Sequence, residues 1–503
     1  MPEIVLSTLN AKHIHASLGL RYLFANLGGL QSKATIQEFT LEPWPIDIAE
    51  QLLASKPRII GLGVYIWNAE RSQQLVALLK EISPETVIVL GGPEVSHEWQ
   101  GQPIVDQADY LICGQGDLAF AQLCRQLLKG ERPISKVIQA EVPPLESLAL
   151  PYDYYSDEDI KHRLVYVEAS RGCPFKCEFC LSALDRTALP FPEEPFMAAL
   201  ERLYQRGVRH FKFVDRTFNL NPQKSAEILN FFLQRLDDQL FLHFEVIPDH
   251  LPQILKELLP RFPAGSLQLE IGIQSFNPEV QTIISRKQDN AKSQENLRWL
   301  RQETQAHLHA DLIIGLPGED LTSFAQSFNE LAALNPHEIQ VGVLKRLKGS
   351  PIIRHTDSYG MRYNPAPPYN ILCNNLLDFK TVQQLNRFTR YWEMIANSGR
   401  FQNTLPLILG NRPFEHFLQL SDWLYITTQQ VHKIALKRLF ELLFSGLKEA
   451  LDLDSTKVIS ALALDYDASG IKGHLTFLHT GNPSAASRIL EKDSRKARQT
   501  RHQ

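Results

Sequence analysis

The stretch Arg171-Gly172-Cys173-Pro174-Phe175-Lys176-Cys177-Glu178-Phe179-Cys180 holds three of the six cysteines of this 503-residue chain. Three thiolates on one turn can each bind one iron of a cubane cluster, and the fourth iron then lacks a protein ligand and can bind a substrate. Gly172 and Pro174 suit a backbone that wraps tightly around such a cluster. The spacing therefore predicts a 4Fe–4S cluster whose ligands are Cys173, Cys177 and Cys180.

Two other uses of these cysteines compete with the cluster. A structural zinc site normally takes four ligands with paired spacing, and the chain has no second cysteine pair. A thioredoxin-like redox pair could use Cys177 and Cys180, but it would leave Cys173 without a role. Cys373 stands alone in the sequence and is expected to be a small buried residue rather than a reactive one.

The cysteine stretch follows the first of six apolar runs that alternate with helical patterns. This alternation predicts a parallel sheet, and six strands fit a partial (β/α)6 barrel better than a closed eightfold one. Catalytic groups of such barrels lie at the carboxyl ends of the strands, where the cysteines fall. The expected strands are 164–172, 210–215, 241–247, 267–273, 308–315 and 338–344.

Short strands also alternate with amphipathic helices in the N-terminal third. This pattern predicts an α/β domain with a doubly wound parallel sheet, whose ligands lie beyond the carboxyl ends of the strands. The expected strands are 3–9, 35–41, 58–66, 86–92 and 108–114.

The rest of the chain indicates where the domains begin and end. A proline-bearing segment over 141–155 is typical of a linker, and the breakers at 363–368 end the barrel pattern. The basic tail over 494–503 is expected to be a frayed terminus. We expect an N-terminal domain over 1–140, a linker over 141–160, a partial barrel over 161–365, and a mainly helical C-terminal domain with the tail over 366–503.

The composition limits the partners and the location. The hydrophobic content of 44% and the charged content of 21% are normal for a soluble globular protein. A net charge of −4 makes nucleic acid an unfavourable partner, because binding phosphates needs a basic excess. The first residues resemble no secretory signal, and no stretch is apolar for long enough to span a membrane. Cysteines that cluster for metal or redox work are typical of the cytoplasm, which is the expected location.

The cysteine stretch resembles the signature of the radical S-adenosylmethionine (SAM) superfamily, Cys-x-x-x-Cys-x-x-Cys, with an aromatic residue, Phe179, before the last cysteine. In that family SAM chelates the open iron, and its reductive cleavage gives methionine and a 5′-deoxyadenosyl radical that abstracts a hydrogen atom. The resemblance covers residues 164–350 and implies that Phe179 lies against SAM.

Further motifs fit the same resemblance. The run Glu270-Ile271-Gly272-Ile273-Gln274-Ser275 is similar to the strand whose acid and glycine contact SAM. Asp215 ends the second strand, where the family places groups near the SAM amine, and Arg286 resembles the basic residue that reaches the SAM carboxylate. Gly315 lies in a run, 311–318, that resembles the adenine-contacting strand. The alternatives are a paired strand charge for Glu270, a helix cap for Asp215 and a solvated helix face for Arg286.

The N-terminal domain resembles the cobalamin-binding domain that is fused to many radical SAM proteins. The matching residues follow three strands, where glycines let a large flat ligand approach the backbone closely. The resemblance implies cobalamin contacts at Gly63, Tyr65, Gly91, Gly92, Pro93, Glu94, Gly114 and Gly116.

The loop after the first strand departs from one pattern of that family. Domains that ligate cobalt through histidine carry Asp-x-His-x-x-Gly there, whereas this chain has Asn10-Ala11-Lys12-His13-Ile14-His15-Ala16-Ser17-Leu18-Gly19. The aspartate is absent, and neither histidine has the right spacing to Gly19. We therefore expect His13 and His15 to be polar loop residues or contacts to the corrin edge, and cobalamin to bind without a histidine ligand.

Together the motifs imply a radical SAM enzyme that uses cobalamin for methyl transfer or a related C–H modification. The implied partners are a small-molecule substrate and a reductant such as flavodoxin or ferredoxin. One alternative is a cobalamin-free oxidoreductase or isomerase with a degenerate N-terminal domain. The other is a non-catalytic redox or light sensor, against which the set of SAM-site residues argues.

Overall fold

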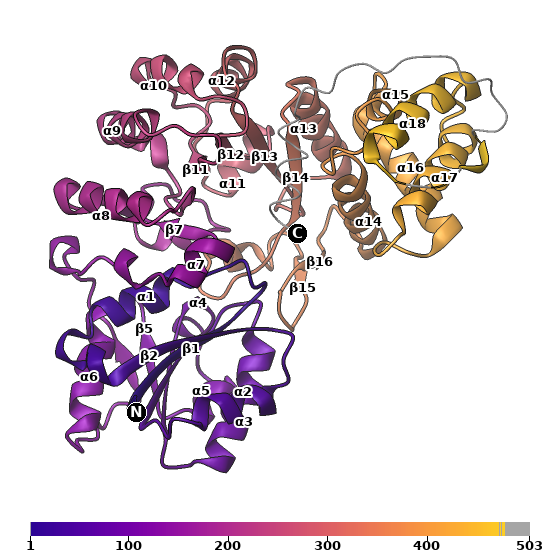
Figure 1. Cartoon of the computed structure of the whole chain (residues 1–503). Coiled ribbons are helices and arrows are strands. Elements are labelled where there is room, and N and C mark those ends of the chain that lie inside the picture. Colours follow the sequence, from indigo (N-terminus) through magenta and orange to yellow (C-terminus); the bar gives the residue numbers. More distant parts are fainter. Residues whose placement is uncertain (1, 472, 474, 478–503) are drawn as a thin grey trace.

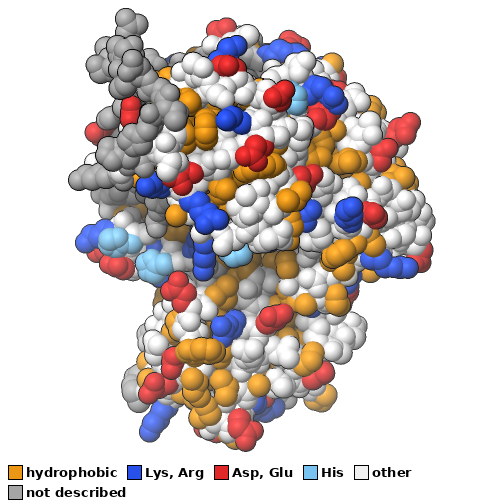
Figure 2. Space-filling model, turned by 90° about the vertical axis from the view of Figure 1, so that its right-hand side faces the viewer, with side chains coloured by type: hydrophobic (Ala, Val, Ile, Leu, Met, Phe, Trp, Pro, Cys, Tyr) orange, Lys and Arg blue, Asp and Glu red, His pale blue; other side chains and the backbone are white. Residues whose placement is uncertain are grey.

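Two parallel sheets of six strands each organise the chain, one in the lower part of Figure 1 and one above it. The computed structural model describes residues 2–471, 473 and 475–477, so the basic tail over 494–503 lies outside the described residues. Within the described part, none of the helices combines the length and the apolar character that crossing a membrane requires. Basic and acidic side chains are interspersed on the face that Figure 2 shows.

The first sheet is doubly wound, as expected. Its strands run in the order β2-β1-β3-β4-β5-β6 and are all parallel. Helices cover both faces of the interior strand β1, so all its residues are buried. The strands are β1 (Ile4–Asn10), β2 (Ala34–Thr40), β3 (Ile59–Gly63), β4 (Val87–Gly91), β5 (Tyr110–Cys113) and β6 (Val137–Gln139). Helices α1 (Leu18–Ala25) and α6 (Asp117–Leu128) pack on one face, and α2 (Pro45–Leu53), α3 (Ala69–Ile82) and α5 (Pro103–Gln107) pack on the other.

The second sheet is the expected partial barrel. Its strands run in the order β7-β10-β11-β12-β13-β14, all parallel, and Figure 1 shows helices along its outer side. The strands are β7 (Val165–Val167), β10 (His210–Phe213), β11 (Phe241–Val246), β12 (Leu267–Gln274), β13 (His307–Ile314) and β14 (Glu338–Val343). The helices between them are α8 (Glu193–Gln205), α9 (Pro222–Leu233), α10 (Gln253–Leu258), α11 (Pro278–Ile283), α12 (Asn290–Glu303) and α13 (Leu321–Ala333).

The strand expected over 164–172 is divided in the structure. After β7 the chain forms a short strand, β8 (Ser170–Arg171), which pairs antiparallel with β9 (Leu189–Pro190). The Asp215 carboxylate accepts hydrogen bonds from the Ala169 N–H (2.9 Å) and the Ser170 hydroxyl (2.6 Å). These bonds satisfy the backbone where it leaves the barrel sheet, and the β8–β9 hairpin holds the cysteine stretch between its strands.

The segment expected to be a linker over 141–160 carries two short 3-10 turns and the start of the helix α7 (Asp157–His162). Tyr152 and Tyr155 are fully buried there. Their hydroxyls donate to the carbonyls of Glu168 (3.0 Å) and Tyr166 (2.8 Å), so this segment packs against β7. The domain boundaries given above remain predictions.

The C-terminal region is mainly helical, as expected. After the hairpin of β15 (Arg362–Tyr363) and β16 (Ile371–Cys373) come α14 (Phe379–Ile395), α15 (Leu405–Leu409), α16 (Pro413–Thr428), α17 (Leu436–Glu449) and α18 (Ser455–Ser469). The Trp392 indole N–H donates to the Ile339 carbonyl (2.8 Å), and one hydrophobic core runs from the barrel helices into these helices. The helical region is thus docked on the β14 edge of the barrel.

Candidate cofactor site

The loop between β8 and β9 carries the three clustered cysteines. Cys173 and Cys177 are buried and Cys180 is half-buried. Gly172 has φ +90°, and a Cβ there would lie 2.8 Å from both the Ala188 nitrogen and the Asp185 carboxylate, so only glycine fits. The Cys173 N–H donates to the Asp185 carbonyl (2.7 Å), which closes the loop.

The three cysteines line one cavity of about 220 Å³ at the carboxyl ends of the barrel strands. Phe179, Glu270, Gly272 and Arg286 line the same cavity, so the structure brings together residues that lie about a hundred positions apart. Among the described residues, no three His, Cys, Asp or Glu side chains converge as ligands of a single metal ion. A cubane cluster has no such requirement, because each thiolate binds a different iron. The cysteine loop therefore fits a cluster with one open iron.

Glu270 supplies a negative charge to this cavity. Its carboxylate lies 2.8 Å from His243 Nε2 and 4.0 Å from the Lys212 ammonium. Burial by itself would raise the pKa of Glu270, but the His243 hydrogen bond and the Lys212 charge outweigh it and lower the pKa to about 2. The ionised carboxylate can accept hydrogen bonds from an ammonium group in the cavity.

Arg286 supplies the opposite charge. Its guanidinium donates to the Gly272 carbonyl and to Gln288 Oε1 (2.9 Å), and Nη1 lies 3.6 Å from Cys177 Sγ. A Cβ on Gly272 would lie 2.5 Å from the Gln274 side-chain amide, so a larger residue here would require that side chain to move. Arg286 can thus meet a carboxylate at the edge of the cysteine loop.

Two predicted SAM contacts are not among the residues that line this cavity. Asp215 is buried and holds Ala169 and Ser170, as described above, and burial raises its pKa to about 6. Gly315 has φ +86°, and a Cβ there would lie 2.6 Å from the Ile371 side chain. The hydrogen bonds of Asp215 and the positive φ of Gly315 each give the residue a role in the fold. The SAM contacts of both residues remain predictions.

The predicted cobalamin residues follow β3, β4 and β5 at the carboxyl edge of the first sheet. Gly92 has φ +103°, and a Cβ there would lie 2.5 Å from the Val64 carbonyl, so the turns after β3 and β4 require glycine to pack together. Gly63 and Gly91 end their strands, and the Tyr65 ring stacks on Trp67 with 4.5 Å between the centroids. Gly114 and Gly116 flank Gln115 before α6, and Pro93 begins α4 (Pro93–Ser96).

Glu94 has partners other than a cofactor. Its buried carboxylate accepts from the Tyr369 hydroxyl (2.5 Å) and pairs with the Lys348 ammonium (2.7 Å), both of which follow the barrel sheet in the chain. The structure therefore shows Glu94 as a contact between the domains, and its contact with cobalamin remains a prediction.

His15 also joins the domains. Its Nδ1 lies 2.6 Å from the Tyr166 hydroxyl on β7, and its backbone forms a bridge with Leu164. His13 is exposed. The Nδ1 nitrogen of His15 is thus hydrogen-bonded to a residue of the barrel.

A polar inner wall of the barrel was not predicted. Lys212 of β10 lies in register with His243 of β11, and His309 of β13 lies in register with Glu270 of β12 and Glu338 of β14. Burial would lower the pKa of His309, but hydrogen bonds to Asp311 (3.1 Å) and Glu338 (3.0 Å) raise it to about 10. The signal was present in the sequence, because apolar residues alternate with these polar ones along each strand.

Glu178, inside the cysteine stretch, was also missed. Its side chain is 1% exposed and accepts hydrogen bonds from the Ser285 hydroxyl (2.5 Å) and from His355 Nε2 (2.6 Å), with Arg354 paired to the same carboxylate. Ser285 precedes Arg286, so Glu178 ties the cysteine loop to the segment that presents the guanidinium.

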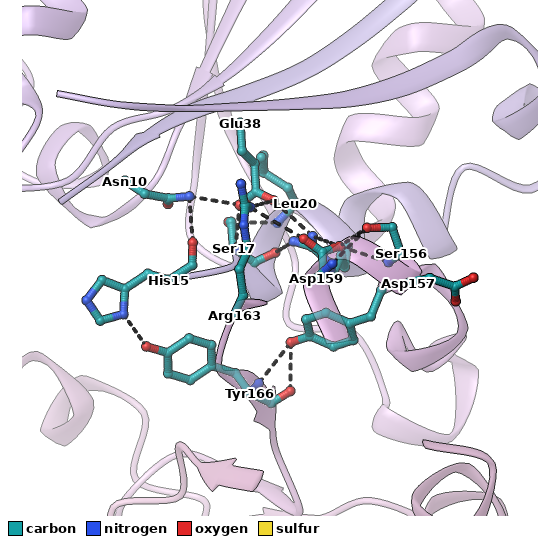
Figure 3. A network of polar contacts seen from close by, with 12 residues as sticks. Asn10, His15, Ser17, Leu20, Glu38, Ser156, Asp157, Asp159, Arg163 and Tyr166 are labelled. Carbon is teal, nitrogen blue, oxygen red and sulfur yellow. Dashed lines mark hydrogen bonds and ion pairs between the residues drawn. The ribbon is translucent and has the colours of Figure 1, made fainter. Parts of the chain in front are cut away.

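The carboxyl edges of the two sheets face each other (Figure 1). The loop after β4 contacts the chain beyond β14 through Glu98 and Arg346 (2.9 Å), and the loop after β5 contacts Arg171 through Asp117 (3.0 Å). At a third place Glu38 of β2 pairs with Arg163, next to the His15–Tyr166 contact (Figure 3). The cysteine loop thus faces the glycine turns across the domain interface.

This arrangement defines a class of protein, and comparisons with known families agree with it. Residues 167–331 match the Radical SAM superfamily, and residues 4–124 match the B12 binding domain. Residues 357–499 match a family described as protein of unknown function, DUF4080. The chain therefore carries a radical SAM domain behind a B12-binding domain, a class that uses a 4Fe–4S cluster, SAM and cobalamin.

Particular relatives come from curated sequences and from solved structures. TokK of Streptomyces tokunonensis, a cobalamin-dependent radical SAM methyltransferase, is 24% identical over 358 residues, which are 62% of this chain and 51% of TokK. The uncharacterized methyltransferase PH0819 of Pyrococcus horikoshii is 24% identical over 335 residues, or 60% of this chain and 70% of that protein. The matched part thus spans about half the length of TokK.

The solved structures share the fold. The cobalamin-dependent SAM radical enzyme OxsB, with aqua-cobalamin and SAM bound, aligns with a TM-score of 0.60 and 13% identity over 100% of this chain and 83% of its own. TsrM from Kitasatospora setae, with cobalamin and a 4Fe–4S cluster bound, aligns with a TM-score of 0.58 and 14% identity over 73% of this chain and 78% of its own.

Proposed function

We propose that this chain is a cobalamin-dependent radical SAM enzyme that modifies a C–H bond of a small molecule, by methyl transfer or a related reaction. The observation that carries the proposal is the meeting of the two carboxyl edges, because it sets the cysteine loop opposite the glycine turns of the B12-binding domain. The methyltransferase names of TokK and PH0819 support methyl transfer.

The residues of the cavity have separate tasks in this proposal. Cys173, Cys177 and Cys180 bind three irons of the cluster and leave the fourth for SAM. Glu270 accepts the SAM ammonium, and Arg286 pairs with the SAM carboxylate. When bound, the cluster and SAM supply the 5′-deoxyadenosyl radical, and cobalamin supplies the methyl group.

A radical SAM protein needs an electron donor, and we infer an acidic one of the flavodoxin or ferredoxin type. Exposed cations surround the cysteine loop: Lys176 lies within it, Lys287 follows Arg286, and Arg354 pairs with Glu178. Opposite charges accelerate such encounters and make their rate depend on salt. The proposed location is the cytoplasm, where these donors and reduced thiols occur together.

The test is anaerobic reconstitution of the full chain, with and without cobalamin, followed by incubation with reductant and methyl-deuterated SAM. We expect 5′-deoxyadenosine in both samples and deuterated methylcobalamin only where cobalamin was added. Cleavage of SAM by a chain that binds no cobalamin would favour the cobalamin-free oxidoreductase or isomerase. Bound cofactors without any SAM cleavage would favour the sensor.

A further inference from the structure

The residue two positions before the first cluster cysteine reaches into the other domain. The Arg171 guanidinium binds both carboxylate oxygens of Asp117, with Nη1 at 3.0 Å and Nη2 at 3.1 Å. Nη1 also donates to Gln115 Oε1 (3.2 Å), and Nε donates to Glu168 (3.0 Å). Gln115 belongs to the glycine turn after β5 and Asp117 begins α6 directly after it, so one side chain joins the two proposed cofactor loops.

A second connection reaches the other side of Cys173. The Gln115 amide donates to the Asp185 carboxylate (3.2 Å), and Asp185 accepts the Cys173 N–H through its carbonyl. The Asp185 carboxylate also packs against Gly172. The glycine turn after β5 therefore contacts the cysteine loop both before and after its first cysteine.

Burial and aromatic packing restrict this contact. The side chains of Arg171 and Asp117 are only 12% and 8% exposed. The guanidinium lies over the Tyr22 ring of the B12-binding domain (4.4 Å) and the Phe191 ring of the barrel (5.6 Å). A forked, stacked guanidinium has few alternative positions, and lysine cannot reproduce its geometry.

We infer that Arg171 and Asp117 are positioning residues that fix the cysteine loop relative to the cobalamin-facing turn of the other domain. The inference rests on the proposed function for the identity of the two cofactors. The coupling of the two loops does not depend on the proposed function, because the contacts join residues of the protein alone.

The interface offers a matched control at another place. Arg163 pairs with Glu38 (3.0 Å) between the same two domains, with side-chain exposures of 14% and 5%. Within the described part of the chain, the Arg163 guanidinium pairs with Glu38 and Asp159 and with no residue of the cysteine loop. Arg163→Lys therefore alters a buried guanidinium contact of the same interface without a direct effect on the loop.

The first experiment uses the full chain without cofactors, under anaerobic reducing conditions. We expect Arg171→Lys and Asp117→Asn each to increase the alkylation rate of Cys173, Cys177 and Cys180 several-fold, because the loop opens locally more often. Arg163→Lys should leave the rate near that of the parent. Peptide mass spectrometry gives the rates, and circular dichroism confirms that each variant is folded.

Equal alkylation rates in the parent, Arg171→Lys and Asp117→Asn would overturn the inference, and so would an equal increase in Arg163→Lys. A failure of the proposed function does not affect this result, since no cofactor is present. If Arg171→Lys does not fold, Asp117→Asn decides the matter alone, because it removes the charge with little change in shape.

The second experiment measures the geometry between the cofactors. In the reconstituted protein, the magnetic interaction between the reduced cluster and the Co(II) form of cobalamin depends on their distance and orientation. We expect electron paramagnetic resonance to show an altered or broadened interaction in Arg171→Lys and Asp117→Asn, and the parent signal in Arg163→Lys. An unchanged interaction in both test variants would contradict the positioning role even if their thiols react faster.

Discussion

At the scale of single residues, the cysteine loop gives the most direct prediction. Changing Cys173, Cys177 and Cys180 together to alanine should abolish cluster absorbance, because the proposed ligands are then gone. The parent should hold about four irons after anaerobic reconstitution. Cys373→Ala is the control, since Cys373 lies on β16 and not in the loop. A triple variant that still holds a full cluster would exclude these residues as its ligands.

Glu270 tests the SAM site without disturbing the cluster. Glu270→Gln should weaken SAM binding by about 1.5–3 kcal/mol, the usual value of a hydrogen bond to a charged group. Its partners His243 and Lys212 remain, so the loss reports the carboxylate charge. SAM affinity is measured by calorimetry on the reconstituted protein, with iron content as the control. An unchanged affinity would mean that Glu270 only balances the charges of the inner wall.

Glu319 gives a pH-dependent prediction. Its side chain is buried, the Ser275 hydroxyl donates to it (2.6 Å), and burial raises its pKa from 4.5 to about 8. Between these values the folded chain holds a proton that the unfolded chain has lost. Stability should therefore fall as pH rises through this window, by up to about 1.4 kcal/mol per pH unit from this group.

Glu319→Gln should remove this contribution to the pH dependence of stability. The melting temperature of the variant should fall less than that of the parent between pH 5 and pH 8, about the window set by the two pKa values. Glu303→Gln, an exposed position at the end of α12, is the control and should follow the parent. Parallel curves for Glu319→Gln and the parent would show that Glu319 is already ionised at neutral pH.

At the scale of elements, the loop after β1 predicts the cobalt ligation. His15 Nδ1 is occupied by Tyr166, and the loop sequence lacks the aspartate of the Asp-x-His-x-x-Gly motif. We expect the Co(II) state to show no triplet splitting from an axial nitrogen. His15→Ala and His13→Ala should therefore leave the spectrum unchanged. Triplets that vanish in either variant would identify that histidine as a ligand.

The strands of both sheets could be predicted because their periodicity is local. Leu308, Ala310 and Leu312 on β13 alternate with His307, His309 and Asp311, and the apolar set is buried under the helices. The three-residue β6 and the β8–β9 hairpin were missed, since so few residues give no period. The hairpin depends instead on Asp215, some 45 positions away.

At the scale of the whole molecule, the contacts between the domains could not be predicted. Glu94 follows a glycine pair and fits a cofactor turn, yet its partners are Lys348 and Tyr369, more than 250 positions later. The sequence shows that a carboxylate stands at the edge of the first sheet. It does not show which surface faces that edge, because this depends on how two independently patterned sheets pack.

These contacts make the stability of the two domains interdependent, and Glu38 tests this. Its side chain is 5% exposed and pairs with Arg21 (2.9 Å) and Arg163 (3.0 Å). It also accepts from the Ser17 N–H (2.6 Å), next to the loop that carries His15 (Figure 3). Glu38→Gln leaves an excess positive charge at a buried interface, and removing one partner of such a network costs about 3–5 kcal/mol.

We expect calorimetry of Glu38→Gln to show an earlier transition in which the B12-binding domain separates or unfolds before the barrel. The control is Glu3→Gln, which removes a more exposed carboxylate that pairs with Lys33 and Arg58 inside the first domain. Such pairs contribute about 0–1 kcal/mol, so this variant should melt like the parent. Hydrogen exchange should show that Glu38→Gln loses amide protection in α1, β2 and α7, on both sides of the interface. If the two variants melt alike, the domains are held by their apolar contacts, and the buried ion pairs contribute nothing to the coupling.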